Sequence, residues 1–201
     1  MKIKICGLRE VGHALLAAEL GADLLGFVFA ESPRRITPDQ ARQIIAELPS
    51  SVQKVGVFVN SRLETINEII SYCGLDFAQL HGEETPEYCS TVQASVIKAW
   101  RVKDGQSLVQ MEDYRDCVEM FLLDTYVKGA VGGTGQAFDW SLAREAAGYG
   151  KIILAGGLTP ENVASAIETV RPYGVDVSSG VETNRCKDIA KIEAFIRQAR
   201  A

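Results

Sequence analysis

Residues 151–161 read Lys-Ile-Ile-Leu-Ala-Gly-Gly-Leu-Thr-Pro-Glu, and this stretch holds a complete junction between a strand and a helix. Its apolar first half, Lys151–Ala155, predicts a buried strand. Thr159 is a suitable helix cap, and the proline and glutamate that follow it are both favourable in a first helical turn. The stretch therefore predicts a strand that passes through a short glycine loop into a helix.

Strands and helices are predicted to alternate in the same way along the whole chain, outward from this junction in both directions. Eight apolar runs predict strands, at Lys2–Cys6, Leu24–Phe29, Gln53–Val59, Phe77–His81, Val96–Arg101, Met120–Asp124, Lys151–Ala155 and Gly174–Ser178. Eight helices are expected, near residues 10–20, 38–47, 61–73, 84–93, 104–116, 139–147, 160–170 and 188–199. Such alternation implies a parallel sheet, either open and doubly wound or closed, and eight units favour the closed (β/α)8 barrel.

The length of the chain limits the architecture further. Dividing 201 residues by eight units gives about 25 residues a unit, whereas barrels of this kind typically have about 250 residues in total, so the loops must be short. No linker or low-complexity segment interrupts the sequence. We therefore expect one barrel domain over residues 1–201, without a separate cofactor-binding domain.

Charge and composition argue against several classes of function. The 26 acidic and 21 basic side chains give a net charge of −5, and no cluster of lysine and arginine suggests a nucleic-acid or membrane-surface partner. Charged residues interrupt every apolar stretch, and the N-terminus lacks the features of a signal peptide, so a cytoplasmic protein is expected. Five widely spaced cysteines and two histidines favour free thiols over structural zinc. We expect a monomer, because no long apolar surface stripe is evident.

The strand pattern predicts which side chains face the inside of the barrel. In several strands one set of alternate residues is apolar, as required beneath covering helices, and the other set is expected to point inward. Active sites of such barrels lie at the C-terminal ends of the strands. The inward set comprises Lys4 and Cys6, Gln79 and His81, Lys98 and Trp100, Leu122 and Asp124, and Asp176 and Ser178, with the second member of each pair at the mouth.

Two glycine-containing loops follow the last two strands. Gly156 and Gly157 lie after the seventh strand, and Ser178, Ser179 and Gly180 lie after the eighth. Glycine lets an anion approach backbone N–H groups closely, and barrels often build a phosphate site from these two loops. We therefore predict phosphate binding here. The alternative is that the glycines only permit tight turns.

A third glycine run, which includes Gly132 and Gly133, lies in the long connection from Thr125 to Phe138. A loop of this length can close over a ligand and exclude water. We expect such a cover, with a surface loop of no particular role as the alternative.

Cys6 and Asp124 are the candidates for acid and base chemistry. Cys6 ends the first strand, where a nearby Lys4 would favour the thiolate, although a free cysteine is more often a small buried hydrophobic residue. Asp124 ends the sixth strand, where a carboxylate is costly unless it is paired or hydrated. Because their strands are well separated around a barrel, the two side chains could reach opposite sides of one substrate.

Other polar residues are candidates for substrate binding. Arg34 and Arg35 follow the second strand, and a guanidinium suits a carboxylate, but solvated charges on a loop are the commoner case. His81 and Asp176 are further candidates in the pocket. A histidine there could equally be a buried core residue whose hydrogen bonds are all made within the protein.

Several blocks of sequence run in order through nearly the whole chain. They are KICG at 4–7, GAD at 21–23, GFVF at 26–29, SPRR at 32–35, VGVFV at 55–59, QLHGE at 79–83, LD at 123–124, GGTG at 132–135, FDW at 138–140, AGGL at 155–158 and VDVSSGVE at 175–182. Together these blocks resemble the phosphoribosylanthranilate isomerases of tryptophan biosynthesis. The segment 103–116 and the tail after residue 182 are less diagnostic.

This resemblance implies a TIM barrel that converts N-(5-phosphoribosyl)anthranilate into 1-(2-carboxyphenylamino)-1-deoxyribulose 5-phosphate by an Amadori rearrangement. It implies no metal, nucleotide or redox cofactor. The family pattern makes Cys6 the general base and Asp124 the general acid, and it assigns the anthranilate carboxylate to Arg35. The glycine and serine loops would hold the phosphate.

Three other functions are considered for a barrel with a phosphate site. The isomerase of histidine biosynthesis would show two half-length repeats, but residues 1–100 and 101–201 show no duplication. Indoleglycerol-phosphate synthase would need a longer N-terminal extension. A non-catalytic sensor of phosphate ligands would need neither Cys6 nor Asp124 at the strand ends.

Overall fold

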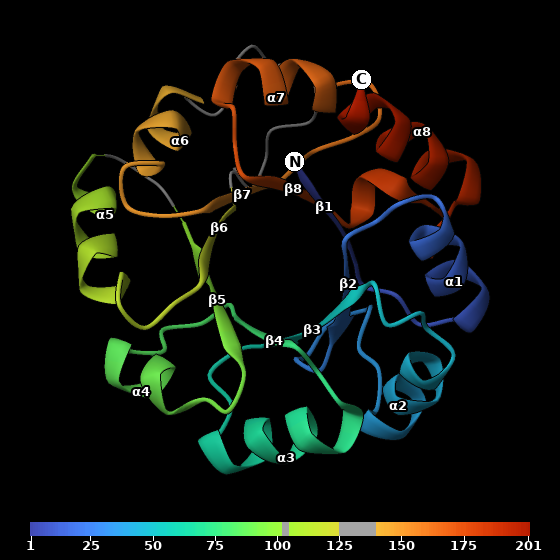
Figure 1. Cartoon of the computed structure of the whole chain (residues 1–201), viewed down its shortest axis with the longest axis horizontal. Helices are drawn as coiled ribbons and strands as arrows, with labels where there is room; N and C mark the ends of the chain where they lie inside the picture. The colour runs from blue at the N-terminus through green and yellow to red at the C-terminus, as the bar shows by residue number, and fades with distance from the viewer. Residues whose placement is uncertain (102–104, 125–139) are drawn as a thin grey trace.

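The predicted barrel is closed in the computed structural model of the protein, which describes residues 1–101, 105–124 and 140–201. Eight parallel strands follow one another in chain order, β8 pairs with β1, and the helices form an outer ring (Figure 1). Each strand end lies within one residue of its predicted position. The strands are β1 (Lys2–Cys6), β2 (Leu24–Val28), β3 (Gln53–Phe58), β4 (Phe77–Leu80), β5 (Ser95–Trp100), β6 (Met120–Asp124), β7 (Ile152–Ala155) and β8 (Gly174–Val177).

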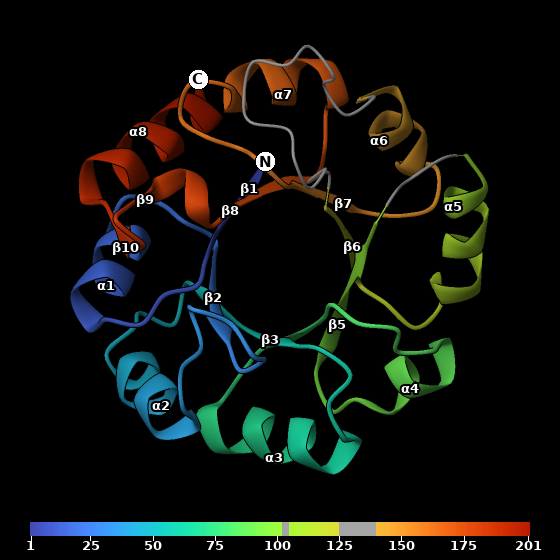
Figure 2. The same cartoon turned by 180° about the vertical axis from the view of Figure 1, so that it is seen from behind.

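The helices are α1 (Val11–Glu19), α2 (Pro38–Ala46), α3 (Leu63–Cys73), α4 (Pro86–Thr91), α5 (Gly105–Val109), α6 (Trp140–Ala146), α7 (Val163–Val170) and α8 (Ile189–Arg200). The fifth unit departs from the continuous helix expected near 104–116, because α5 is followed by the 3₁₀ turn η1 (Gln110–Tyr114). After β8, a second 3₁₀ turn, η2 (Ser179–Val181), leads into a hairpin of β9 (Glu182–Thr183) and β10 (Cys186–Lys187) that was not predicted (Figure 2).

Local hydrogen bonds explain where several helices begin and end. Thr37 caps α2, since its hydroxyl accepts the N–H of Gln40, whose side chain accepts the N–H of Thr37 in return. Helix α7 begins later than residue 160, because the side chain of Asn162 folds back to accept the N–H of Thr159. Helix α3 ends at Gly74, whose φ of 68° requires the left-handed freedom of glycine.

Two apolar layers build the core. The larger layer lies between the strands and the helices, and the smaller one fills the barrel, which is therefore a packed core and not a pore. Lys4, Gln79 and Asp176 are buried polar residues. The apolar residues inside the barrel are Leu24, Val55, Phe77, Ile97, Ala99, Met120, Leu122, Ile153 and Ala155.

Strand β5 faces the opposite way to the prediction. Ala99 pairs in register with Leu122 inside the barrel, so Lys98 and Trp100 point outward toward the helices. A buried lysine is tolerated there because it forms an ion pair with Glu84, with 3.0 Å between Nζ and Oε2. Trp100 packs edge-on against an aromatic ring of η1. The prediction that Trp100 lies at the mouth of the barrel is therefore wrong.

The two ends of the chain meet where the barrel closes. Strand β1 pairs with β8, and Arg200 in α8 donates hydrogen bonds to the carbonyl oxygens of Met1 and Gly21 at 3.0 Å each. The helix that ends the chain thus holds the strand that begins it.

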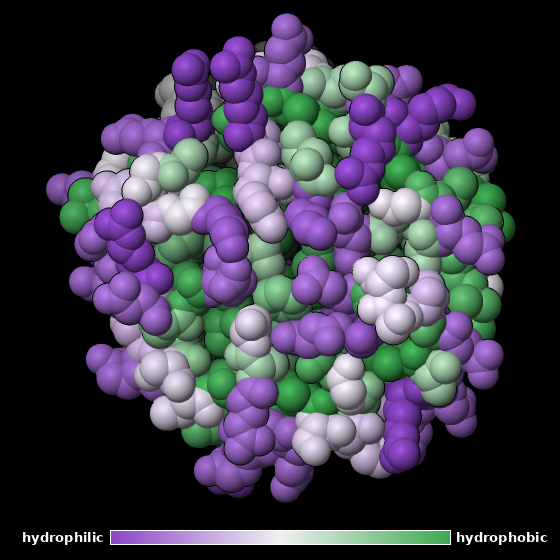
Figure 3. All heavy atoms as spheres, viewed as in Figure 1, coloured by the Kyte–Doolittle hydropathy of each residue, from purple (hydrophilic) through white to green (hydrophobic). Residues whose placement is uncertain are grey.

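The surface is largely polar. Figure 3 shows hydrophilic side chains standing out around the outline of one face, with apolar residues visible between them. The exposed large apolar residues include Val59, Tyr72 and Val109, which come from different elements. In the parts of the chain that the structure describes, no helix is long and apolar enough to cross a membrane.

Candidate active site

A cavity of about 380 Å³, here called the mouth cavity, opens at the C-terminal ends of the strands. It brings together residues of β1, β4, β6 and β8 with the two loops predicted to bind phosphate. Gly132 and Gly133, the predicted cover, lie outside the described residues. The predicted site residues that line the cavity are Cys6, His81, Asp124, Gly156, Gly157, Asp176, Ser178, Ser179 and Gly180.

The two arginines after β2 lie in different pockets. Arg34 lines the mouth cavity, whereas Arg35 lines a separate pocket beside Phe29 and Phe58. Arg35 forms a β-bridge with Val28, and successive side chains of extended backbone point to opposite sides. Arg34 is thus the arginine that lines the mouth cavity, and the assignment of the carboxylate to Arg35 stays a prediction.

Arg34 is held by the hairpin that follows β8. Its Nε and Nη2 each donate to the carboxylate of Glu182 at 2.7 Å, and Lys187 donates to the same carboxylate at 2.8 Å. Burial alone would raise the pKa of Glu182, but these hydrogen bonds outweigh it and lower that pKa to about 2. Lys187 also donates to the carbonyl oxygen of Ser178 at 2.9 Å, which ties the hairpin to the serine loop.

Cys6 lies at the end of β1 in a site that keeps its thiol protonated. Burial raises the pKa of the Cys6 thiol, and Lys4 and Lys187, which act in the opposite direction, do not outweigh it. The predicted help from Lys4 toward the thiolate is thus smaller than the effect of burial. Gly26 on β2 makes room for the sulfur, since a Cβ there would lie 2.8 Å from Sγ.

Lys4 and Asp176 form an ion pair across β1 and β8. Lys4 is 0% exposed, and its Nζ lies 2.8 Å from Oδ1 of Asp176. Burial alone would lower the pKa of Lys4, but the charge of Asp176 and its hydrogen bond to Lys4 act in the opposite direction, and the pKa is raised. The prediction that Lys4 and Asp176 both point into the barrel is confirmed.

The two predicted phosphate loops are packed directly against each other. Gly156 and Gly157 have φ angles of 87° and 66°, a conformation that favours glycine. A Cβ on Gly180 would lie 1.9 Å from the carbonyl oxygen of Leu158, so the second loop approaches the first as closely as its backbone allows. The prediction that they adjoin at one cavity is confirmed, while phosphate binding itself stays a prediction.

Asp124 faces His81 across the cavity. Oδ2 of Asp124 lies 3.5 Å from Nε2 of His81, and Nδ1 of the same ring lies 3.3 Å from Nε2 of Gln79. These contacts meet the condition that a carboxylate at this position be paired. The sequence placed all three side chains inside the barrel but did not show that they contact one another.

The groups available for chemistry are a thiol, two carboxyls, an imidazole and a guanidinium. All five cysteines are free thiols. Among the described residues, no three histidine, cysteine, aspartate or glutamate side chains gather as a metal site requires. The cavity thus combines ionisable side chains with two glycine-containing loops.

The chain matches a protein-family model described as N-(5'phosphoribosyl)anthranilate (PRA) isomerase over residues 3–198. It is 54% identical over 202 residues to the N-(5'-phosphoribosyl)anthranilate isomerase of Pelobacter propionicus, covering 100% of this chain and 96% of that protein. The crystal structure of phosphoribosyl anthranilate isomerase from Thermotoga maritima is 44% identical, with a TM-score of 0.90, and covers 100% of this chain and 98% of that one.

A second solved structure contains a ligand. It is a phosphoribosyl anthranilate isomerase in complex with reduced 1-(o-carboxyphenylamino)-1-deoxyribulose 5-phosphate. It is 42% identical to this chain, with a TM-score of 0.87, and covers 100% of this chain and 98% of that one. The matches to the family model and to the full-length relatives show that the chain belongs to the family of N-(5'-phosphoribosyl)anthranilate isomerases.

Proposed function

We propose that the protein converts N-(5'-phosphoribosyl)anthranilate into 1-(2-carboxyphenylamino)-1-deoxyribulose 5-phosphate in tryptophan biosynthesis. One observation carries the proposal: Cys6 and Asp124, from β1 and β6, line a single cavity together with the glycine and serine loops. An acid and a base on separate strands can address two positions of one substrate, while the loops bind its phosphate.

Asp124 acts as the general acid in this mechanism. The ribose ring opens when its oxygen receives a proton as the C1–O bond breaks, so Asp124 must be protonated at that moment. The products of this step are an iminium ion on the substrate and the carboxylate of Asp124. The positive iminium nitrogen then makes the C2–H bond acidic.

Cys6 acts as the general base. Its thiolate removes the proton from C2, and the resulting enolamine tautomerises to the ketone. In the free protein the raised pKa of Cys6 favours the thiol. The positive charge that forms on the substrate favours loss of the thiol proton to water, and the thiolate that remains then takes the proton from C2.

Both arginines remain candidates for the anthranilate carboxylate, because the family resemblance assigns it to Arg35 and Arg34 lines the mouth cavity. Nε and Nη2 of Arg34 already donate to Glu182, so a substrate would have to use its remaining N–H groups. The guanidinium is a planar fork that suits a carboxylate. Gly156, Gly157, Ser178, Ser179 and Gly180 supply the phosphate site of the proposal.

The assay that tests the proposal is loss of phosphoribosylanthranilate fluorescence. The wild type should turn the substrate over, and Cys6→Ala and Asp124→Asn should each lower kcat by about 10²-fold or more while a reduced product analogue still binds. Cys186→Ala is the matched control, because that cysteine is exposed and outside the cavity.

Two results would contradict the proposal in different ways. Unchanged turnover in either active-site variant would remove that residue from its role. A wild-type protein that binds phosphate but does not turn the substrate over would be a sensor of phosphate ligands.

A further inference from the structure

His81 connects the proposed acid to a buried amide. It follows β4, and its Nε2 lies 3.5 Å from Oδ2 of Asp124. Its Nδ1 lies 3.3 Å from Nε2 of Gln79, two residues earlier on the strand. The mechanism above gives neither His81 nor Gln79 a role, although both line the mouth cavity.

The orientation of the Gln79 amide and the tautomer of His81 depend on each other. With the amide nitrogen toward the ring, the amide donates and Nδ1 of His81 accepts. A neutral imidazole then keeps its proton on Nε2, where it faces the carboxylate of Asp124. This arrangement suits the form that Asp124 has after it has given up its proton.

One atom is left over in that arrangement. Gln79 is 2% exposed, and its Oε1 is buried without a hydrogen-bond partner among the described residues. An unpaired buried acceptor is costly, and such groups are uncommon in native proteins unless they have a function. Either orientation of the amide places one of its groups against Nδ1 of His81 and leaves the other without a partner among the described residues, so both orientations are open to it.

Turning the amide of Gln79 over gives the second arrangement. Oε1 then accepts a hydrogen bond from Nδ1–H, and the bare Nε2 of His81 can accept one from protonated Asp124. The same three side chains thus suit either form of the carboxyl. A general acid occupies both forms in turn, because it begins the step protonated and ends it as the carboxylate.

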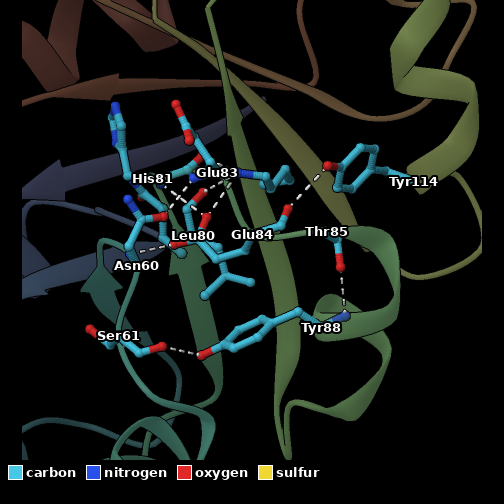
Figure 4. A network of polar contacts seen from close by, with 12 residues as sticks. Asn60, Ser61, Leu80, His81, Glu83, Glu84, Thr85, Tyr88 and Tyr114 are labelled. Atoms are coloured by element: carbon cyan, nitrogen blue, oxygen red, sulfur yellow. Dashed lines mark hydrogen bonds and ion pairs between the residues drawn. The ribbon is translucent and has the colours of Figure 1, made fainter.

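The backbone around His81 is held by a network of polar contacts that includes Glu84 (Figure 4) and a buried ion pair. Nζ of Lys98 donates to the carbonyl oxygens of Gly82 at 2.8 Å and Leu80 at 3.4 Å, one on each side of His81. It also lies 3.0 Å from Oε2 of Glu84, which accepts the N–H of Gly82 at 2.9 Å. Both charged side chains are 2% exposed. These contacts fix the backbone on both sides of His81, and so the position of its ring.

We propose that His81 is a positioning residue that holds Asp124 in both of its protonation states, and that Gln79 allows this by turning its amide. The proposal rests on the proposed function, in which Asp124 is the general acid. The proton given to the ribose oxygen comes from the O–H bond of Asp124 alone. The imidazole is neutral before and after the step, and its proton moves between Nδ1 and Nε2 by exchange with water.

Two substitutions of His81 separate its two contacts. His81→Gln retains an amide near the position of Nε2, within reach of Asp124, whereas His81→Asn retains one near Nδ1, within reach of Gln79 only. We expect His81→Gln to keep kcat within about threefold of the wild type and His81→Asn to lower it by about tenfold or more, with smaller changes in KM. A kcat of His81→Asn equal to or above that of His81→Gln would overturn the proposal.

Ring ¹⁵N NMR tests the hydrogen bonds without any turnover. The chain has two histidines, and His13→Gln removes the other signal without touching the mouth cavity. In that variant, at a pH where Asp124 is the carboxylate, the neutral ring of His81 should carry its proton on Nε2. Adding Gln79→Glu should move the proton to Nδ1, because a carboxylate can only accept.

The NMR spectra and the kinetic measurements test different parts of the proposal, so each can contradict its part without the other. With Asp124 as the carboxylate, a neutral ring already protonated at Nδ1, or one that does not respond to Gln79→Glu, would overturn the role of Gln79. A wild-type protein without turnover would overturn the proposed function instead, and the spectra would still report how the ring is held.

Discussion

Glu182 binds Arg34, the arginine that lines the mouth cavity. Its carboxylate is 6% exposed and accepts hydrogen bonds from Arg34 and Lys187, which hold its pKa at about 2 against the effect of burial. The side chain of Arg34 is therefore fixed by a partner that stays charged across the ordinary range of pH. A lone arginine would have to be ordered by the substrate itself, at a cost in entropy.

The low pKa of Glu182 predicts how stability depends on pH. The carboxyl titrates near 4.5 when unperturbed and at about 2 in the folded protein, so the unfolded chain binds this proton more readily. Its stabilising contribution is complete above about pH 4.5 and is lost as the pH falls toward 2. Urea unfolding across this range should show a steeper loss for the wild type than for Glu182→Gln, and parallel curves would contradict the assignment.

The two arginines after β2 make a matched pair for a binding experiment. Arg34→Met should raise KM for phosphoribosylanthranilate by about tenfold or more, because it removes a charged contact to the substrate. Arg35→Met should leave KM near the wild-type value, since that side chain lines another pocket. The opposite order of effects, measured by the same fluorescence assay, would restore Arg35 to the role that the family resemblance suggests.

Single residues could be predicted where strand alternation decides their direction. Cys6, His81 and Asp124 were placed in one cavity because they end strands of the correct parity. The choice between Arg34 and Arg35 depends on a bridge to Val28 in a loop, which no periodic pattern reveals. The protonation of Cys6 could not be read from Lys4 alone, because burial has the larger effect.

At the scale of the element, β5 shows where alternation fails. Lys4 and Lys98 each alternate with apolar neighbours in their strands, yet Lys4 points into the barrel and Lys98 out of it. What distinguishes them is the partner that each finds, Asp176 on β8 and Glu84 after β4. These partners are distant in sequence, so the direction of β5 could not be settled from its own residues.

The contact between the two phosphate loops predicts a local effect of Gly180→Ala. The new Cβ would lie 1.9 Å from the carbonyl oxygen of Leu158, so the loops must separate. We expect the dissociation constant for inorganic phosphate, measured by calorimetry, to rise by about tenfold or more, which corresponds to about 1.4 kcal/mol. Circular dichroism should show the barrel intact.

Gly12→Ala is the control for this experiment. Gly12 lies within α1, and a Cβ there meets nothing within 4 Å. The control should bind phosphate as the wild type does and gain up to about 1 kcal/mol of stability, because alanine favours a helix. Equal phosphate affinities in both variants would show that the loop contact does not shape the site.

For the whole molecule, the count of eight alternating units was sufficient to predict the closed barrel. Such a pattern specifies the fold because each strand must be covered by a helix and each helix must bury one face. The β9–β10 hairpin was not predicted, because its strands have only two residues each and are too short to show an alternation of apolar and polar residues. The expectation of a monomer stays a prediction.

The meeting of the chain ends predicts that a circular permutant will fold. Arg200 already contacts Met1, so a short glycine linker can join Ala201 to Met1, and the exposed turn between Ala147 and Gly148 offers a place for new ends. This permutant should show cooperative urea unfolding and bind phosphate. A permutant opened inside β6 should not fold, and equal behaviour of the two would contradict this account of closure.

The pairing of β1 with β8 also has a consequence for how each molecule is made. A ribosome releases β1 first, and its edge toward β8 stays unpaired until Gly174–Val177 has been translated. An unpaired edge of this kind is a template for association with other chains. Until β8 has emerged, this edge of β1 has no partner within its own chain, and that interval is when it is most open to association with other chains.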